Sequence, residues 1–482
     1  MNYIISLVWI VYATLQSIIV QPKFFKRELE VLFDLYEINQ SNQVQLIKAL
    51  KFIKQQNSTS IHVQLEDLKD NTDYEFKYQV NLMDLIGNSG IYSGKFKTFS
   101  SNQNEFSFVA STCARSQSNS RVFTDILDLN PDFMINVGDM HYSARNYSKL
   151  ETFVLAYHEI FKQRNQRNLY QSKPLIYTFD DHDFGSNNAD GLSDSHEYAH
   201  QAYRDIIPNY GIQDDMGIYQ NFKVGKVNFI LLDGRTFKNT YYKDTNIQMK
   251  WLEEQIIQSA KDDNIEGVIL LSSLPWSSKR EWNVTTTYHE KEKIGKLIEE
   301  LGFNTGKLNN KFLALISGDY HLLSYDTGLR NDDGNFPVFQ CSPLDSKPTC
   351  KSGGFEGDII LQRGGFCQFK VDKHRTQPNR SCLGFKGYIH DKVMMTFNTC
   401  DEQLKLEMDE KLQILAQVRD DETIPQIERS QAGVLHDMIL NGSICPATPM
   451  VKIQALFALF GLFLFIIATY NIMRNICYVR IE

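Results

Sequence analysis

Apolar runs alternate with stretches of helical periodicity along the central part of the chain, from Glu105 to about residue 330. Short apolar runs bounded by polar residues are typical of buried strands, and four stand out: FSFVAST, DFMINVGD, GVILLSS and FLALISGD. The sequence also predicts helices near 120–129, 247–261 and 290–301, and a hairpin over 218–235 with its turn at Gly225-Lys226. Strands that alternate with helices indicate an α/β domain.

Residues 22–100 have the pattern of an all-β domain. Tyr74, Phe76, Tyr78 and Val80 recur at period two, which predicts that they face one side of a sheet. This strand pattern resembles a fibronectin type III or immunoglobulin-like sandwich. No cysteine pair links the strands, so the resemblance depends on the strand pattern alone.

An apolar segment at the N-terminus resembles the hydrophobic region of a signal peptide. Residues 4–20 are apolar apart from three polar side chains, and a polar Gln21-Pro22-Lys23 follows them. We therefore predict a signal peptide over residues 1–21. No basic residue precedes the segment and no clear cleavage site ends it, so an uncleaved anchor is the alternative.

A second apolar segment lies near the C-terminus. Residues 453–470 contain no charge, and as a helix they would span roughly 27 Å of hydrocarbon. The sequence predicts a transmembrane helix over 453–473, preceded by a helical stalk over 411–452. Basic residues follow in the tail, 474–482, which predicts a cytoplasmic tail. The chain is then a single-pass type I membrane protein of the secretory pathway, with its main domain lumenal or extracellular.

The composition is that of an ordinary globular protein. Of the 482 residues, 42% are hydrophobic and 22% are charged. Fifty Lys and Arg against 58 Asp and Glu give a net charge of −8, so no global positive field exists to attract a nucleic-acid backbone. We expect no specific nucleic-acid binding.

The cysteines cluster in the later part of the chain. Six lie between Cys341 and Cys445, and in an oxidising lumen this even set predicts disulfides in one of fifteen pairings. Cys477 falls in the predicted tail, and Cys113 is left without a partner. Six glycosylation sequons agree with passage through the same compartment: Asn39, Asn57, Asn146, Asn283, Asn379 and Asn441.

Four polar clusters each follow an apolar strand. They are Ser111-Thr112-Cys113, Gly138-Asp139-Met140-His141-Tyr142, Asp180-Asp181-His182-Asp183 and Gly318-Asp319-Tyr320-His321. Carboxylates, a thiolate, a phenolate and imidazoles are the groups that a two-metal hydrolytic site requires. One carboxylate must bridge the two cations, and Asp139 is the candidate. Any single cluster is equally compatible with a helix cap, but four at four strand ends favour a metal site.

These motifs resemble a known family. GDMHY, TFDDHDFG, LLDGRTF and LISGDYH follow STCARS in the order seen in the alkaline phosphatase D (PhoD-like) group of calcineurin-like metallophosphatases. The GD-x-x-Y element is shared with purple acid phosphatases, whose tyrosine binds a ferric ion. The resemblance implies a four-layer α/β/β/α sandwich, here over residues 101–410 with cysteine-bearing loops at 341–400. The sequence also predicts two strands within residues 387–410. The N-terminal domain of this family is often immunoglobulin-like, which fits residues 22–100.

The resemblance implies two metal sites. One would be surrounded by Cys113, Asp139, Tyr142 and His321, and the other would use Asp139, Asp181 and Asp319. A thiolate and a phenolate suit a strongly Lewis-acidic ion, whereas carboxylates suit a hard cation. The implied pair is Fe³⁺ and Ca²⁺, with Mg²⁺, Mn²⁺ or Zn²⁺ as alternatives. A buried Cys113 that acts only as a small hydrophobe is the other interpretation.

Further residues in these motifs are candidates for contact with a phosphoryl group. His182 lies between two carboxylates and would donate a proton to a leaving oxygen, with Asp183 orienting its ring. Arg235 would clamp phosphoryl oxygens bidentately, and a buried salt bridge is its alternative role. Arg115 and His141 are further candidates for substrate contact.

One position departs from the family pattern. Related two-metal phosphatases place a histidine ligand shortly before a proline on the strand equivalent to VILLSSLPW, where this chain has Ser272, Ser273 and Leu274. A hard, oxygen-preferring ion tolerates the loss of an imidazole, and Asp319 in place of a histidine points the same way.

Two classes of function remain open. The first is a membrane-anchored phosphatase that hydrolyses phosphate mono- or diesters with a metal-activated hydroxide. The second is a non-catalytic surface protein in which a degenerate phosphatase domain serves adhesion or binding. The survival of all four motifs together favours the enzyme. The natural substrate, the ester preference, the disulfide pairing and the oligomeric state stay open at this stage.

Overall fold

The structure is a computed structural model that describes residues 29–54, 62–81, 91–103, 105–142, 147–238, 247–276, 287–308, 311–328, 334–349, 355, 359–378 and 380–401. The predicted signal peptide (1–21), stalk (411–452), transmembrane helix (453–473) and tail (474–482) lie outside these residues. Among the helices that are described, none is both long enough and apolar enough to cross a bilayer.

The N-terminal strands form one antiparallel sheet with the order β2-β1-β3-β4. Its strands are β1 (Leu29–Ile38), β2 (Val44–Lys54), β3 (Asp73–Asn81) and β4 (Ile91–Lys97). The predicted alternation is confirmed for Tyr74, Phe76 and Tyr78, which are buried beside Phe33. Within the described ranges this region contains a single sheet, so the second sheet of a sandwich stays a prediction.

Two six-stranded mixed sheets form the body of residues 106–398. One has the order β16-β15-β14-β5-β6-β7 and the other β12-β13-β11-β10-β9-β8. The strands of the first are β5 (Phe106–Ser111), β6 (Phe133–Asn136), β7 (Leu175–Tyr177), β14 (Gly365–Lys373), β15 (Ser381–Ile389) and β16 (Lys392–Asn398). Those of the second are β8 (Gln220–Val224), β9 (Val227–Leu231), β10 (Gly267–Ser272), β11 (Phe312–Ser317), β12 (Leu323–Asp326) and β13 (Val338–Cys341).

The two sheets pack face to face through a core rich in phenylalanine. Phe108 stacks on Phe133 at 5.2 Å and on Phe369 at 4.9 Å between ring centroids, and Phe229 of the opposite sheet meets Phe108 edge-on at 5.4 Å. Apolar residues alternate with less buried ones along β14 and β15, which is the period expected for strands that bury one face. Burying these rings is the main force that holds the sheets together.

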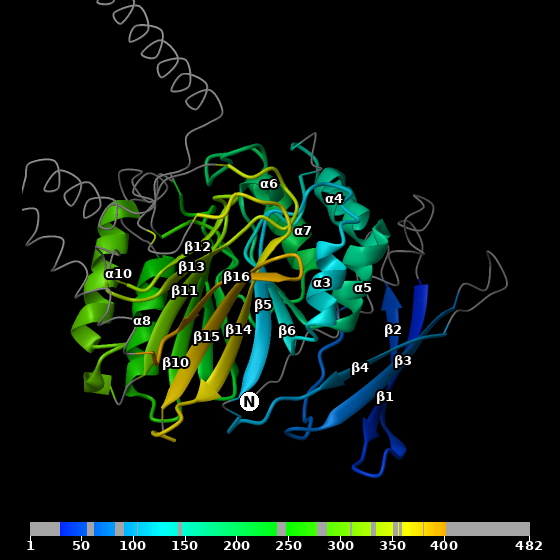
Figure 1. The fold of residues 1–482 in the computed structure, drawn as a ribbon. Helices are drawn as coiled ribbons and strands as arrows, with labels where there is room; N and C mark the ends of the chain where they lie inside the picture. The colour runs from blue at the N-terminus through cyan, green and yellow to red at the C-terminus, as the bar shows by residue number, and fades with distance from the viewer. Residues whose placement is uncertain are drawn as a thin grey trace, which may run out of the picture. The chain divides into compact units, whose positions relative to one another are not determined.

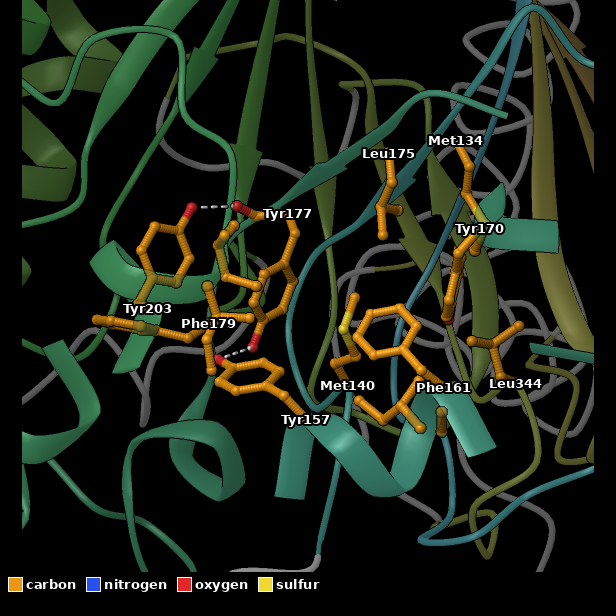
Figure 2. Close-up of a cluster of buried hydrophobic side chains, with 14 of the residues drawn as sticks. Met134, Met140, Tyr157, Phe161, Tyr170, Leu175, Tyr177, Phe179, Tyr203 and Leu344 are labelled. Atoms are coloured by element: carbon orange, nitrogen blue, oxygen red, sulfur yellow. Dashed lines mark hydrogen bonds between the residues drawn. The ribbon is translucent and has the colours of Figure 1, made fainter. Parts of the chain in front are cut away.

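Helices cover the outer face of each sheet, and Figure 1 shows them on opposite sides of the paired sheets. One group is α3 (Val122–Asp128), α4 (Leu150–Lys162), α5 (Arg164–Ser172), α6 (Asp181–Phe184) and α7 (His196–Ile206), and the other is α8 (Ile247–Lys261) and α10 (Thr287–Leu301), with a 3₁₀ turn at Gly306–Leu308. The first group packs on the first sheet through tyrosines and aliphatic side chains, as Figure 2 shows for Tyr157, Tyr177 and Tyr203. The predicted four layers are therefore observed, and the helices predicted near 120–129, 247–261 and 290–301 are confirmed.

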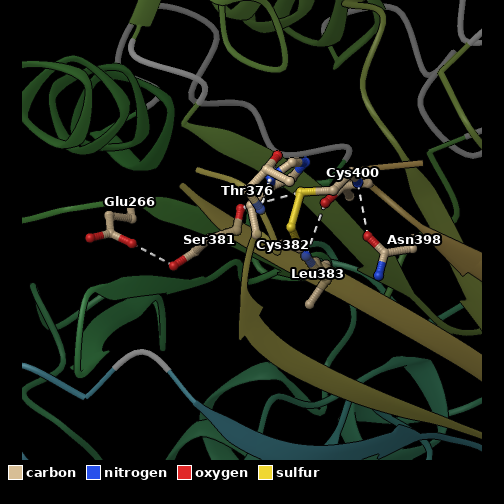
Figure 3. The surroundings of a disulfide bond; sticks show 9 residues. Glu266, Thr376, Ser381, Cys382, Leu383, Asn398 and Cys400 are labelled. Carbon is tan, nitrogen blue, oxygen red and sulfur yellow. Dashed lines mark hydrogen bonds between the residues drawn. A yellow bond between two sulfur atoms is a disulfide. The ribbon is translucent and has the colours of Figure 1, made fainter. Parts of the chain in front are cut away.

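The prediction of irregular cysteine-bearing loops after Cys341 is wrong over residues 365–386, where β14 and most of β15 form, whereas the strands predicted within 387–410 agree with the end of β15 and with β16. Strands β14, β15 and β16 pair antiparallel there and extend the first sheet beside β5. The apolar alternation in GFCQFKVDK and SCLGFKGYI is the signal for these strands. Two of the predicted disulfides form, Cys341–Cys367 and Cys382–Cys400, and Figure 3 shows the second. Cys350, Cys445 and Cys477 lie outside the described residues.

Candidate metal centre

Polar loops from both six-stranded sheets meet at the carboxyl ends of their strands. Those after β5, β6 and β7 carry Cys113, Asp139 and Asp181, and the loop after β11 carries Asp319 and His321. Their ligand atoms lie within 4.8 Å of one another in three overlapping groups: Cys113, Asp139 and His321; Asp139, Asp181 and His182; Asp180, Asp181 and Asp319. The fold thus brings together all four sequence motifs.

The loops that carry these ligands adopt unusual backbone conformations. Cys113, Asp139, Asp319 and His321 all have positive φ, from 50° to 62°. A left-handed conformation costs a non-glycine residue roughly 1 kcal/mol or more and is typical of functional sites. Gly138, at φ 108°, lets two loops approach, because a Cβ there would lie 2.4 Å from the Cβ of Asp180.

One side of the centre combines a thiol, a phenol, an imidazole and a carboxylate. The Tyr142 hydroxyl donates to Asp139 Oδ2 at 2.6 Å and lies 3.0 Å from His321 Nε2. Cys113 Sγ lies 3.6 Å from the same Asp139 oxygen. His321 Nδ1 is 2.7 Å from the Lys347 carbonyl oxygen, a contact that requires Nδ1 to carry the proton and leaves Nε2 unprotonated, with a lone pair that can coordinate a cation.

The protonation of these groups depends on their burial. Desolvation raises the pKa of the Cys113 thiol, and the nearby Asp139 carboxylate raises it further. Desolvation also raises the pKa of Asp139, with the charge of Asp181 adding to it, and the pKa of Tyr142, where Asp139 adds to it. A Lewis-acidic cation would displace these protons and compensate the buried negative charge. The donor set therefore fits a metal ion of that kind.

The other side of the centre consists of carboxylates around a buried arginine. Arg235 Nε donates to Asp180 Oδ1 at 2.5 Å, and Nη2 lies 3.9 Å from Asp181 and 3.8 Å from Asp319. The residue is 0% exposed. This placement favours the alternative role of Arg235, a buried ion pair with the acidic cluster, and the phosphate clamp stays a prediction.

The acidic residues around Arg235 differ in their electrostatics. Burial raises the pKa of Asp180 to about 7, although Arg235 lowers it in part. Burial also opposes ionisation of Asp181, yet the charges of Arg235 and His182 outweigh it and lower the pKa of Asp181. Asp181 is thus more readily ionised than Asp180 and is available to a cation.

Asp183 and His182 occupy different environments. Asp183 is buried and accepts hydrogen bonds from the backbone amides of Asp180 at 3.0 Å and His141 at 3.2 Å, which completes a capping box with Asp180. It therefore ties two site loops together, which differs from the predicted role of orienting His182. The His182 ring is half-buried and lies 4.1 Å from the Tyr142 ring, at the metal cluster, and burial lowers its pKa.

His141 and Arg115, the predicted substrate contacts, are placed very differently. His141 is 1% exposed and packs edge-on against Tyr157 at 4.8 Å, and burial lowers its pKa to about 3. This burial favours a packing role for His141, and its contact with substrate stays a prediction. Arg115 is exposed, two residues after Cys113, and its backbone amide donates to Asp345 Oδ1 at 2.7 Å.

Several residues that support the centre escaped the sequence analysis. Thr112 Oγ1 lies 3.3 Å from Cys113 Sγ, the Lys347 carbonyl holds His321, and Asp345 holds the loop after Cys113. In the sequence Thr112 stands out only through its place beside Cys113, and the other two lie in the segment after Cys341 for which the sequence predicts irregular loops. A backbone carbonyl leaves no signal in a sequence, whereas a lone acidic residue after Pro343-Leu344 is a weak one.

Comparison with known proteins finds a family match for part of the chain. Residues 108–284 match the model of the PhoD-like phosphatases. The chain contains a PhoD-like phosphatase domain. It is therefore a phosphoric ester hydrolase, and with its clustered ligands a metal-dependent phosphatase. The GD-x-H loop follows the matched segment in the sequence. In the fold, its Asp319 and His321 lie beside the ligand residues of that segment.

Solved structures show the same fold over a longer stretch. The structure of PhoD matches with a TM-score of 0.58 and 14% identity, over 77% of this chain and 86% of that chain. A purple acid phosphatase from yellow lupin (Lupinus luteus) seeds matches with a TM-score of 0.50 and 11% identity, over 77% of this chain and 69% of that chain. No curated protein sequence matches the chain. The PhoD-like domain thus has a metallophosphatase fold that includes the strands after residue 284.

Proposed function

We propose that this chain hydrolyses phosphate mono- or diesters with a two-cation centre that its strand-end loops hold. The observation that carries the proposal is the set of three overlapping ligand groups, in which Asp139 and Asp181 are each shared by two. A shared carboxylate is what a bridged pair of cations requires. Asp139 is the proposed bridge.

The donor chemistry supports different cations on the two sides. Cys113, Tyr142 and His321 suit Fe³⁺, and Asp181 and Asp319 suit Ca²⁺, with Mg²⁺, Mn²⁺ or Zn²⁺ as alternatives. Cations bound there would supply Lewis acidity toward a phosphoryl oxygen and a hydroxide nucleophile at neutral pH. Serine at positions 272 and 273 leaves the second side without an added imidazole, which supports a hard cation there.

The residues of the chain supply orientation and proton transfer. His182 is half-buried beside Tyr142 and within the Asp139 and Asp181 group, a position from which its imidazole would donate a proton to a leaving oxygen. Arg115 is exposed close to Cys113 in the sequence and is the proposed cationic contact for the rest of the substrate. Arg235 holds the carboxylates of Asp180, Asp181 and Asp319 in place through its buried guanidinium.

We also propose that the enzyme works in the secretory lumen or outside the cell, anchored by the helix at 453–473. The two disulfides support an oxidising compartment. The uncharged segment 453–470 and the N-terminal apolar segment support membrane insertion. A second sheet over the N-terminal strands, which would complete an immunoglobulin-like sandwich, belongs to the same proposal.

The decisive experiment compares Asp139→Asn with Asp215→Asn, a matched change at an exposed position. Turnover is measured on p-nitrophenyl phosphate and bis-p-nitrophenyl phosphate across pH, together with the metal content of the purified full-length chain. We expect Asp139→Asn to remain folded and to lose turnover by at least about a hundredfold, because the shared ligand is removed. Asp215→Asn should match the wild type.

Two results would argue against the proposal. A folded Asp139→Asn protein with full turnover would show that the centre is not catalytic. A folded wild-type chain without metal and without turnover would favour the non-catalytic surface protein. The ratio of the two substrates' turnover defines the ester preference.

A further inference from the structure

A short segment between β13 and β14 hydrogen-bonds to the metal-bearing loops of both sheets. We call residues 342–349 the strap. Toward the loop after β5, the amides of Leu344 and Ser346 donate to the carbonyls of Thr112 at 2.9 Å and Cys113 at 3.2 Å. The strap therefore follows the backbone that carries the Cys113 ligand.

The same strap holds the other sheet's ligand loop. The Lys347 carbonyl accepts from His321 Nδ1 at 2.7 Å, and the Thr349 amide donates to the His321 carbonyl at 3.3 Å. Thr349 Oγ1 also donates to the carbonyl of Tyr320 at 2.9 Å. Cys113 follows β5 of one sheet and His321 follows β11 of the other, so the strap connects ligands that the two sheets supply separately.

Asp345 provides the side-chain contact that fixes the strap to the Cys113 loop. It is 5% exposed, and its carboxylate accepts from the Arg115 amide at 2.7 Å and from the Ser118 hydroxyl. The Ser118 carbonyl is itself held by Gln166 Nε2 at 2.8 Å, on α5. Hydrogen bonds to a carboxylate are stronger than neutral ones, so this contact sets where the loop lies.

The strap is anchored at its base as well. Cys341, directly before it, is disulfide-bonded to Cys367 of β14. The amides of Gly364 and Gly365 donate to the carbonyls of Leu344 at 2.6 Å and Pro343 at 2.8 Å. A segment held at its base and along its length can impose a fixed separation on two loops.

We propose that Asp345 is a positioning residue of the metal centre: through the strap it fixes the Cys113 loop relative to His321 and keeps His321 Nε2 aimed at the cation. This inference rests on the proposed function, because it assigns a role toward the same cation site. Asp345 makes no ligand contact of its own within the three ligand groups. Its effect therefore acts through Cys113 and His321.

The experiment measures cation affinity rather than turnover alone. The full-length chain is stripped of metal with a chelator and titrated with Co²⁺, whose thiolate absorption reports bonding to Cys113. Removal of a residue that supports a metal ligand typically costs 10–100-fold in metal affinity, so we expect Asp345→Ala to weaken Co²⁺ binding by about tenfold or more and to reduce the thiolate absorption. Asp345→Asn should restore most of the affinity, because an amide can accept from Arg115 and donate to Ser118.

A matched control separates positioning from a general loss of stability. Asp326 is 1% exposed and accepts from the Gly328 amide at 3.0 Å at the far end of β12. Asp326→Ala should therefore lower the urea midpoint and leave Co²⁺ affinity unchanged. Ser118→Ala removes one donor to Asp345 and serves if Asp345→Ala does not fold; it should weaken Co²⁺ binding by a smaller factor.

The outcomes are distinguishable. If the wild type binds Co²⁺ and folded Asp345→Ala or Ser118→Ala binds it with the same affinity, the positioning role is overturned and the proposed function stands. An affinity loss of equal size in Asp326→Ala would also overturn it. A folded wild-type chain that takes up no Co²⁺ and no other metal would overturn the proposed function, and the positioning role with it.

Discussion

Arg235 supplies the positive charge that allows carboxylates of two motifs to lie together. Its guanidinium contacts Asp180 directly and lies within 3.9 Å of Asp181 and Asp319. Burial opposes a charge at this position, but the three carboxylates outweigh burial and raise the pKa of Arg235. A planar guanidinium reaches several carboxylates at once, which a lysine ammonium does less well.

Replacing this residue tests whether it acts as a counter-ion. We expect Arg235→Gln to lower the free energy of unfolding by about 3–5 kcal/mol, because buried carboxylates lose their partner. Arg235→Lys should lower the free energy of unfolding by less, because it keeps the positive charge. Urea unfolding of the metal-free chain measures the change, and Arg121→Gln, at an exposed ion pair with Asp125, is the control with a much smaller expected effect. Wild-type stability combined with a raised KM would instead support the phosphate-clamp role.

The β15–β16 hairpin completes the outer edge of the first sheet. Cys382 near the start of β15 is disulfide-bonded to Cys400 just after β16 (Figure 3), and Leu383 and Thr399 exchange hydrogen bonds beside this bond. Ser381 donates to Glu266, which directly precedes β10. The metal centre lies at the carboxyl ends of the strands, so this disulfide belongs to the opposite end of the sheets.

Removal of this disulfide should affect stability and spare the site. We expect the double variant Cys382→Ser, Cys400→Ser to lower the free energy of unfolding by about 3 kcal/mol, since the bond closes a loop with a sequence separation of 18. Denaturant unfolding and metal content measure the two effects, with reductant-treated wild type as the comparison. Loss of metal at unchanged stability would contradict the assignment.

The whole molecule contains several histidines that folding keeps neutral. Burial lowers the pKa of His158 on α4 to about 3, and the charge of Lys162 lowers it further. Burial lowers the pKa of His200 on α7 to about 3 as well, with His196 and Arg204 adding to the effect. The unfolded chain takes up protons near pH 6.5 whereas the folded chain does not, so acid favours the unfolded state.

The contribution of these histidines to the free energy of unfolding should therefore be fully present above pH 6.5 and be lost progressively as the pH falls from 6.5 toward 3. Each such histidine lowers the free energy of unfolding by about 1.36 kcal/mol for each pH unit below 6.5, which amounts to about 2 kcal/mol at pH 5. His158→Gln removes one proton site, so the variant should lose less stability in acid than the wild type. We expect the free energy of unfolding of the wild type to fall by about 2 kcal/mol more than that of the variant between pH 7 and pH 5. Urea unfolding at several pH values measures this, and parallel curves for the two proteins would contradict it.

The sequence by itself determined the local elements and the order of the motifs. The β8–β9 hairpin, α8 and the buried strands β5, β6, β10 and β11 follow from hydrophobic periodicity, because burial of an apolar face depends on residues that are near in the chain. The place of GDMHY, DDHD and GDYH after those strands predicted a metal site, and the family resemblance implied Asp139, Asp181 and His321 as ligands. In the fold, Asp139 shares one ligand group with His321 and another with Asp181.

Only the tertiary structure decided what those residues face. Arg235 became a buried counter-ion, His141 packed against Tyr157, and Asp183 bonded to backbone amides, because these roles depend on burial and on partners from distant strands. The strap shows the same limit: Lys347 acts on His321 through a carbonyl, a group that every residue carries. Local pattern specifies which groups are available, whereas packing specifies their protonation, their partners and their access to substrate.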